Sequence, residues 1–261
     1  MNENDHQNKK PDKELESARL EIEALKRKLQ YKDQLLSTIF SNFSHEIRTP
    51  MNGIIGFSEL LHLNKEISCE EVISYAGIIE ESSLLLMAIL NDTLDIARIE
   101  AGKYKIYPET FDLSDLLFEI FMEYKSQADR KKLQFLLDNM ISEQFIVESA
   151  PGALKKVLVK LIDNAIKFTK EGWIKVGYLN EGEHIVFYVE DTGIGISDVI
   201  RENLFDSFTN QEVSKSRKVS GTGLDLTLCK GLVNLLGGEI QYVPKSTPGS
   251  LFRFSILNYK Y

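Results

Sequence analysis

The segment SHEIRTPMNGIIGFSELL, residues 44–61, continues a long heptad pattern, and the two together decide the fold of the N-terminal part of the chain. The apolar residues that recur every seven positions are Leu15, Ile22, Leu29, Leu36 and Phe43. Glu, Lys, Arg and Gln are frequent between them, so the apolar stripe is narrow, as in helices that pair with another helix. The pattern predicts a parallel dimeric coiled coil, and the alternative is an amphipathic helix packed within a monomer.

A second apolar helix is predicted after a short turn. The first helix runs on to about Leu63, residues 64–68 have the composition of a turn, and the second helix is expected at about residues 69–101. One hairpin of this kind cannot bury both apolar stripes. The sequence therefore predicts two hairpins that join into a dimeric four-helix bundle.

From Tyr104 onward, helical patterns alternate with β-like runs. The predicted helices cover residues 113–130, 151–168 and 223–236, and the predicted strands cover residues 133–138, 144–148, 173–179, 184–190, 238–243 and 251–257. This order predicts an α+β sandwich, in which helices cover one face of a single sheet. Residues 205–222 have no clear periodicity, and such a long connection is expected to be a functional lid or a mobile loop.

Composition excludes several classes of protein. The chain of 261 residues is 43% apolar and 27% charged, with a net charge of −8, which argues against wholesale disorder and against broad binding of nucleic acid. The longest uninterrupted apolar stretch runs from Leu84 to Leu90, short of the roughly 20 residues that span a bilayer. Cys69 and Cys229 have no metal-ligand spacing. We therefore expect no membrane segment, no signal peptide and a reducing, cytoplasmic environment.

The first chemical motif is Phe43-Ser44-His45-Glu46-Ile47-Arg48-Thr49-Pro50. His45 lies off the heptad seam, so its imidazole should face the solvent. Glu46 could accept a hydrogen bond from one ring nitrogen, which leaves the other as a nucleophile near neutral pH. The alternative is an ordinary solvated histidine on a charged helix.

Three further motifs have residue types that suit a nucleotide. Asn164 stands on an apolar helix, and its amide oxygen is a suitable hard ligand for Mg²⁺, with Lys167 on the same face. Asp191 begins the run Asp-Thr-Gly-Ile-Gly after a predicted strand, where glycines allow a ligand to approach the backbone. The run Gly-Thr-Gly-Leu at residues 221–224 opens a predicted helix, a typical site for phosphate. Taken singly, these motifs also describe a helix cap and ordinary turns.

In this order and at these distances, the motifs resemble those of sensor histidine kinases, from about Leu29 to Leu257. Residues 44–61 are similar to the H box of the dimerisation and phosphotransfer domain. NAIKFT, DTGIGI and GTGL are similar to the N box and the two glycine boxes of the Bergerat-type ATP-binding domain, and residues 204–208 to its F box. The resemblance implies a tail and coiled coil at residues 1–35, a helical hairpin at 36–102 and an ATP-binding domain at 103–261 with its lid at 205–222.

The resemblance also implies a mechanism. His45 would attack the γ-phosphate of ATP with Glu46 as general base, Asn164 would hold Mg²⁺, and Thr49 would support dephosphorylation of a receiver domain. The residues that the resemblance implies around the nucleotide are Lys160, Lys167, Phe168, Asp191, Gly193, Gly195, Phe205, Phe208, Gly221, Thr222, Gly223 and Leu224. The implied partners are a second copy of the chain and a response-regulator receiver domain. The implied location is the cytoplasm, for a soluble kinase or for the cytoplasmic part of a membrane receptor.

Four positions depart from the family pattern, among them Lys156, where a glutamine is common, and Ala153, where an arginine is common. Asp225 stands where the second glycine box usually has its third glycine, and Lys160 stands where an asparagine is common. Lys160 could compensate for the charge of Asp225, or both could mark a weakened catalytic domain. The alternatives to a working kinase are therefore a dimeric signalling scaffold, a receiver phosphatase, and an ATPase that shares only the nucleotide fold.

Overall fold

The computed structural model describes residues 19, 22, 23, 26, 43–63, 67–138, 145–201, 204–205 and 224–259. The chain divides into two units, Met1–Thr49 and Pro50–Tyr261. In the first unit every described residue is helical. Most of the predicted coiled coil and all but the first residue of the predicted lid lie outside the described residues, so these two predictions remain predictions.

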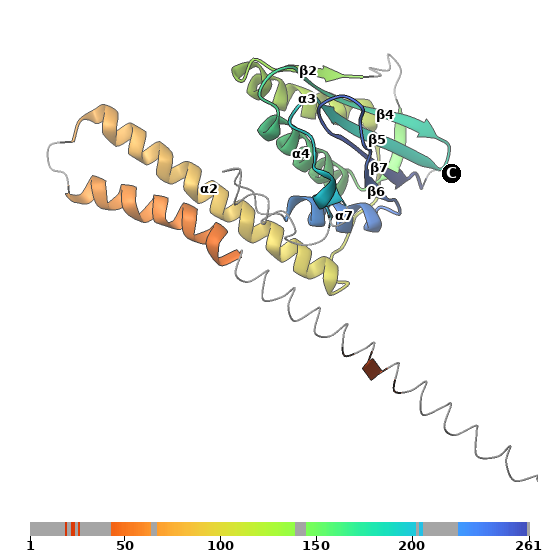
Figure 1. Ribbon diagram of the computed structural model, residues 1–261, viewed down its shortest axis with the longest axis horizontal. Helices are drawn as coiled ribbons and strands as arrows, with labels where there is room; N and C mark the ends of the chain where they lie inside the picture. Colours follow the sequence, from red (N-terminus) through yellow and green to blue (C-terminus); the bar gives the residue numbers. More distant parts are fainter. Residues whose placement is uncertain are drawn as a thin grey trace, which may run out of the picture. The chain divides into compact units, whose positions relative to one another are not determined.

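The second unit begins with a helical hairpin. Its helices are residues 50–63 and α2 (Cys69–Glu100), which run side by side in Figure 1. The rings of Phe57 and Tyr75 lie 5.3 Å apart between centroids. Nearer the other end, a Cβ on Gly53 would come within 2.8 Å of Oγ of Ser82, so the glycine allows the two helices to approach closely. These contacts confirm the predicted antiparallel pairing.

Both ends of α2 follow from local chemistry. At the N-terminus, Oγ of Ser68 accepts a hydrogen bond from the amide of Glu71, and the Glu71 carboxylate accepts one from the amide of Ser68. At the C-terminus, Gly102 has φ of +64°, a conformation that glycine adopts without strain. The predicted second helix is therefore confirmed to within one residue.

The surface of α2 is unusually apolar. Its buried residues are Ile89 and Asp92, and its exposed large apolar residues are Val72, Ile73, Leu84, Leu85, Met87, Leu90 and Leu94. By length and composition alone, this helix is the one candidate membrane span among the described residues. An apolar face of this kind is also what one hairpin of a dimeric bundle presents to its partner hairpin. The expected absence of a membrane segment therefore stays a prediction.

The rest of the second unit contains two sheets. The larger has the strand order β2 (Gln134–Leu137), β4 (Trp173–Glu181), β5 (His184–Asp191), β7 (Leu251–Leu257) and β6 (Ile240–Tyr242). The pair β2 and β4 is parallel and the other neighbours are antiparallel, so β4 with β5 and β6 with β7 form two hairpins. The smaller sheet pairs β1 (Glu109–Asp112) with β3 (Ile146–Ser149).

Helices cover one face of the larger sheet. The long helices are α3 (Leu113–Arg130), α4 (Pro151–Phe168) and α7 (Asp225–Leu235) (Figure 1). A short helix, α5, consists of residues Asp198–Arg201. Alternate residues of β5, among them Ile185, Phe187 and Val189, are buried on the covered face. They pack with the apolar face of α4 into one core. The predicted α+β sandwich is confirmed, but the expectation of a single sheet was wrong, because β3 pairs with the unpredicted β1 in a second, smaller sheet.

Two short elements were not predicted, and one helix begins later than expected. The strand β1 is only four residues long and has no apolar alternation, so no periodic signal marks it. The four-residue α5 is too short for a helical period. The helix expected at residues 223–236 is described from Asp225 to Leu235, with Leu224 as its N-cap.

Candidate functional site

His45 lies in the helical end of the first unit, and its side chain is exposed, as its position off the heptad seam predicted. Glu46, the next residue, is half-buried. Oγ1 of Thr49 donates a hydrogen bond to the carbonyl of His45, 3.3 Å away. The imidazole of His45 is therefore accessible to solvent. The hydroxyl of Thr49 points back along the helix toward His45.

Asp191 is the anchored centre of the second motif. It is the last residue of β5 and is 4% exposed. Its Oδ1 accepts hydrogen bonds from the amide of Gly193 at 2.8 Å and from the amide of Ser250 at 3.2 Å. Burial raises the pKa of Asp191, and these amide hydrogen bonds oppose that effect only in part. The result is a carboxylate held in one orientation at the edge of the sheet.

The glycines around Asp191 are required by close packing. A Cβ on Gly193 would press against the carbonyl of Phe168, at the end of α4. Gly195 has φ of +69°, and a Cβ there would come within 3.0 Å of the carbonyl oxygen of Gly249. Gly249 itself has φ of +117°, and any Cβ would overlap the carbonyl of Asp191. The loop after β5 is therefore shaped by its neighbours on both sides.

Lys245 is a residue of this site that the motifs did not reveal. Its Nζ donates to the carbonyl of Asp191 at 3.0 Å and lies 2.7 Å from Oε1 of Glu190. The same ammonium lies 5.3 Å from the ring centroid of Trp173. Its charge also acts to lower the pKa of Asp191. Lys245, Gly249 and Ser250 come from the segment before β7, and the only local sequence signal was the turn pair Pro248-Gly249.

The helix α4 carries the Asn164 motif to the same place. The amide of Ile194 donates to the carbonyl of Phe168 at 3.3 Å, so the C-terminal end of α4 contacts the loop after Asp191. Asn164 is half-buried and lies one turn from this end. Lys167 is exposed, with Nζ 5.4 Å from the ring centroid of Phe168. The structure therefore brings together two motifs that are 27 positions apart in the chain.

The amide oxygen of Asn164 is a donor that suits a magnesium ion whose other ligands are phosphate and water oxygens. Among the described residues, no group of three or more His, Cys, Asp or Glu side chains could hold a metal. Mg²⁺ needs only one or two protein oxygens when phosphate and water supply the others. The single amide oxygen of Asn164, with lysines a turn away on either side, is such a donor.

The F-box segment and the last glycine box are described only in part. Leu204 is buried, and the ring of Phe205 lies edge-on to Phe252, 6.3 Å between centroids. The hydroxyl of Thr227 on α7 donates to the carbonyl of Phe205 at 3.5 Å. Leu224 is buried where α7 begins. The roles expected of Phe208, Gly221, Thr222 and Gly223 fall on residues outside those that the structure describes.

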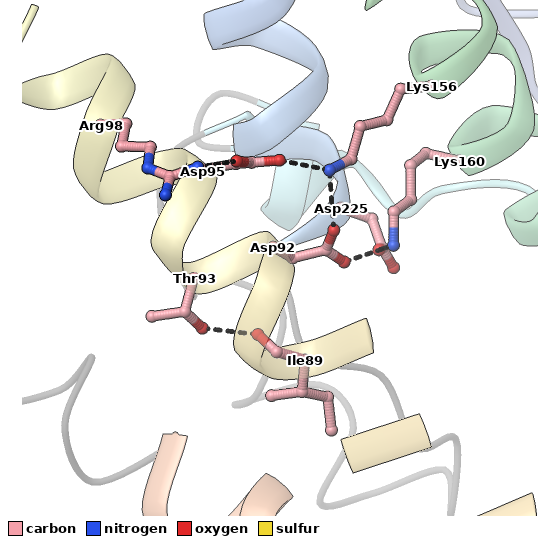
Figure 2. A network of polar contacts seen from close by, with 8 residues as sticks. All are labelled: Ile89, Asp92, Thr93, Asp95, Arg98, Lys156, Lys160 and Asp225. Atoms are coloured by element: carbon pink, nitrogen blue, oxygen red, sulfur yellow. Dashed lines mark hydrogen bonds and ion pairs between the residues drawn. The ribbon is translucent and has the colours of Figure 1, made fainter. Parts of the chain in front are cut away.

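Two of the residues that depart from the family pattern, Lys160 and Asp225, contact each other. Nζ of Lys160 lies 3.0 Å from Oδ1 of Asp225 and also forms an ion pair with Asp92 of α2 (Figure 2). Burial alone would lower the pKa of Lys160, but the charges and hydrogen bonds of Asp225 and Asp92 outweigh burial and raise it. Lys160 is therefore charged at neutral pH, and it offsets the charge of Asp225.

Two family models match the chain. Residues 35–102 match the His Kinase A (phospho-acceptor) domain, and residues 149–260 match the histidine kinase-, DNA gyrase B- and HSP90-like ATPase family. The first match contains His45. The second contains Asn164, Asp191 and Asp225.

Individual proteins give the same picture. The chain is 36% identical to the sensor histidine kinase GacS of Pseudomonas protegens. The alignment covers 93% of this chain and 26% of GacS. It is similar to full-length ShkA in complex with AMPPNP, with a TM-score of 0.60, 26% identity, and coverage of 86% of this chain and 45% of that one. For the histidine kinase ThkA in complex with the response regulator TrrA, the TM-score is 0.60 at 21% identity, over 89% of this chain and 64% of that one. The chain thus spans about a quarter of the length of the curated relatives that it matches.

Proposed function

The chain belongs to the histidine kinase family, and we propose that it is an ATP-dependent protein-histidine kinase. In this proposal it phosphorylates His45 and then passes the phosphate to an aspartate of a response-regulator receiver domain. The observation that carries the proposal is the combination, in one chain, of an exposed histidine in a phospho-acceptor domain with an anchored Asp191 site in an ATPase domain. Neither half alone would support a transfer of phosphate to a protein.

Asp191 would recognise the adenine of ATP. A carboxylate that is fixed by two backbone amides is a good acceptor for an exocyclic amino group, and the loop that contains Gly193 and Gly195 leaves the backbone free to lie against the base. We propose that Phe168, Phe205, Phe208 and Leu224 border the nucleotide, and that Gly221, Thr222 and Gly223 belong to a lid at residues 205–222. The similarity to a kinase solved with AMPPNP supports a nucleotide at this site.

The phosphates would lie along α4. Lys160, Asn164 and Lys167 share one face of this helix, because residues three and four positions apart are neighbours on a helix. We propose that Asn164 holds Mg²⁺ and that the lysines contact phosphate oxygens. When bound, Mg²⁺ would neutralise charge on the phosphates. Lys167 and Lys160 would orient the terminal phosphate and stabilise the charge that develops as it leaves.

The transfer itself would use His45 and Glu46. One imidazole nitrogen forms a bond to the γ-phosphorus, the bond from that phosphorus to the bridging oxygen breaks, and ADP leaves with that electron pair. Glu46 takes the proton from the imidazole. In the second step, a receiver carboxylate forms a bond to the same phosphorus, the bond to nitrogen breaks with its electron pair left on the imidazole, and Glu46 returns the proton to the ring. We propose that Thr49, one helical turn from His45, supports a separate activity, the removal of phosphate from the receiver.

We propose the same organisation that the sequence predicted: a coiled coil at residues 1–35, a dimerising hairpin at 36–102 and a catalytic domain at 103–261. The exposed apolar face of α2 supports a homodimer. The complex of ThkA with its response regulator supports a receiver domain as partner. Since the curated relatives are roughly three to four times as long as this chain, we propose that the chain acts as the cytoplasmic part of a larger receptor.

The test is incubation of the chain with γ-labelled ATP and Mg²⁺, followed by treatment with acid and with alkali. A phosphohistidine should lose its label in acid and keep it in alkali. Asn164→Asp should greatly reduce labelling, because an added charge beside the phosphates disturbs both metal and nucleotide, while the fold persists. Release of free phosphate without any protein label would contradict the proposal.

A second function, that of a weakened kinase acting mainly as a scaffold or receiver phosphatase, is favoured by one observation. Lys160, which is proposed to contact phosphate, forms ion pairs with Asp225 and Asp92. If this pairing abolishes turnover, the chain should bind ATP without labelling and should still remove phosphate from a labelled receiver domain. Labelling of the chain itself would dismiss this second function.

A further inference from the structure

Five charged side chains connect the hairpin helix α2 to the two helices α4 and α7. Asp92 pairs with Lys160 and, at 3.5 Å, with Lys156. Lys156 also pairs with Asp95, and Lys160 pairs with Asp225 at 3.0 Å. Figure 2 shows these side chains pointing toward one another from three different helices. We call Asp92, Asp95, Lys156, Lys160 and Asp225 the ion cluster.

The ion cluster is more than a set of surface pairs. The side chains of Asp92 and Lys160 are only 10% and 17% exposed. Arg98, at 3.7 Å from Asp95, adds a third positive charge, so three acids face three bases. Partly buried pairs are less screened by salt than exposed ones, and a carboxylate left alone there would be costly. The contacts therefore have consequences for how firmly α2 is held.

The apolar surface beside the ion cluster is fitted to the same contact. Ile96 and Ile99 of α2 pack against the core of the sandwich. A Cβ on Gly231 of α7 would lie 3.0 Å from Cγ2 of Ile99, so the glycine leaves room for α2. The end of α2 thus rests on α7 through apolar contacts and on α4 through ion pairs.

The contact joins two different family domains. Asp92 and Asp95 lie within the match to the phospho-acceptor domain, whereas Lys156, Lys160 and Asp225 lie within the match to the ATPase family. Lys160 also lies one helical turn before Asn164, on the face where the phosphates of ATP are proposed to bind. One lysine therefore serves both a contact between domains and the phosphate site.

We propose that the ion cluster is a latch which holds α2 on the catalytic domain in the nucleotide-free chain and which opens when nucleotide phosphates take Lys160. This inference rests on the proposed function, because it assumes that ATP binds along α4. The carboxylates of Asp92 and Asp225 occupy Lys160 as phosphate oxygens would, and their charges repel a triphosphate. Latch closure and nucleotide binding are therefore in competition.

The competition must act in both directions. If closing the latch weakens nucleotide binding by some factor, then nucleotide must loosen the contact of α2 by the same factor. The latch would keep the catalytic domain on α2 until ATP arrives and would then free it. The regulation thus needs no residue outside the ion cluster and the phosphate site.

The first test is the affinity of the full chain for Mg-AMPPNP, measured by calorimetry in wild type and in Asp92→Asn. The variant keeps the shape of the side chain and removes its charge. We expect it to bind at least about fivefold more tightly at low salt, the lower end of typical coupling between sites. Near 1 M salt, where the Debye length is about 3 Å, the difference should shrink.

Glu119→Gln is the matched control. Glu119 of α3 pairs with Lys155 of α4 at 2.8 Å, so this variant also breaks an ion pair of α4, but one outside the ion cluster. It should leave the affinity unchanged. Equal gains in affinity for Asp92→Asn and Glu119→Gln would mean that the effect comes from the overall charge of the chain, and this result would overturn the latch.

The second measurement is amide hydrogen exchange over residues 89–99 of α2. We expect exchange to be faster in Asp92→Asn than in wild type, and faster in wild type when AMPPNP is added. Affinity within twofold of wild type and unchanged exchange would overturn the latch while leaving the kinase proposal intact. Failure of wild type to bind AMPPNP at all would overturn both.

Discussion

At the scale of single residues, Asp191 is the side chain that we propose recognises the adenine base of ATP. Its buried carboxylate accepts hydrogen bonds from two backbone amides, and its backbone carbonyl accepts one from Nζ of Lys245. Burial raises its pKa, so protonation begins at a higher pH than for an ordinary aspartate. A protonated Asp191 would be a poorer acceptor for the amino group of adenine. If Asp191 recognises adenine as proposed, nucleotide binding should therefore be sensitive to acid.

We therefore predict that affinity for ATP falls on acidification at a pH above the usual aspartate value of about 4. Affinity should fall because the ionised carboxylate is the form that accepts the hydrogen bond from adenine. A raised pKa means that this ionised form is lost at a higher pH. Titration of ATP affinity against pH measures this. Asp191→Asn should bind more weakly and should lose that part of the pH dependence, and a variant whose pH profile matches wild type would contradict the role of Asp191.

At the scale of elements, the sequence predicted the long helices and missed what depends on distant strands. The bounds of α3 and α4 agree with the prediction because each has a strong apolar period. Asn164 and Asp191 were recognised from local motifs. Lys245 and Ser250 were not, because they reach Asp191 across 54 and 59 residues, through the pairing of β7 with β5. No local pattern contains that pairing.

The turn before β7 provides the prediction at this scale. Gly249→Ala should destabilise the chain by at least about 2 kcal/mol, because the backbone has a positive φ and the new Cβ would overlap the carbonyl of Asp191. Denaturant unfolding measures this. Gly152→Ala is the control, since Gly152 lies in α4 with open space around its Cβ position, and alanine there should stabilise by about 0.5–1 kcal/mol. Equal effects of the two variants would contradict the steric argument.

At the scale of the whole molecule, the second unit contains one well-buried core and one exposed apolar surface. The core lies between the sheet and its helices, whereas α2 exposes a row of leucines. A soluble chain rarely leaves so large an apolar face uncovered. A second hairpin of the same kind would cover it, and this would also bring two copies of His45 into one assembly.

Leu84→Glu combined with Leu94→Glu should therefore convert a dimer into a monomer. Both leucines are exposed on α2, and a charge at each position would have to be buried in the bundle. Sedimentation velocity measures the change. Tyr107→Glu is the control, because Tyr107 is 75% exposed and lies outside the hairpin. A wild-type chain that sediments as a monomer would contradict the dimer directly.

We propose that this chain transfers phosphate from ATP to His45, and this transfer is tested most directly by comparing two histidines among the helical residues 43–63. His45 and His62 are both exposed and lie in the helical residues 43–63, but only His45 lies in the Ser-His-Glu motif. With γ-labelled ATP and Mg²⁺, His62→Ala should label as wild type does, and His45→Ala should not label at all while still binding ATP. Label that persists on the His45→Ala protein would contradict the account.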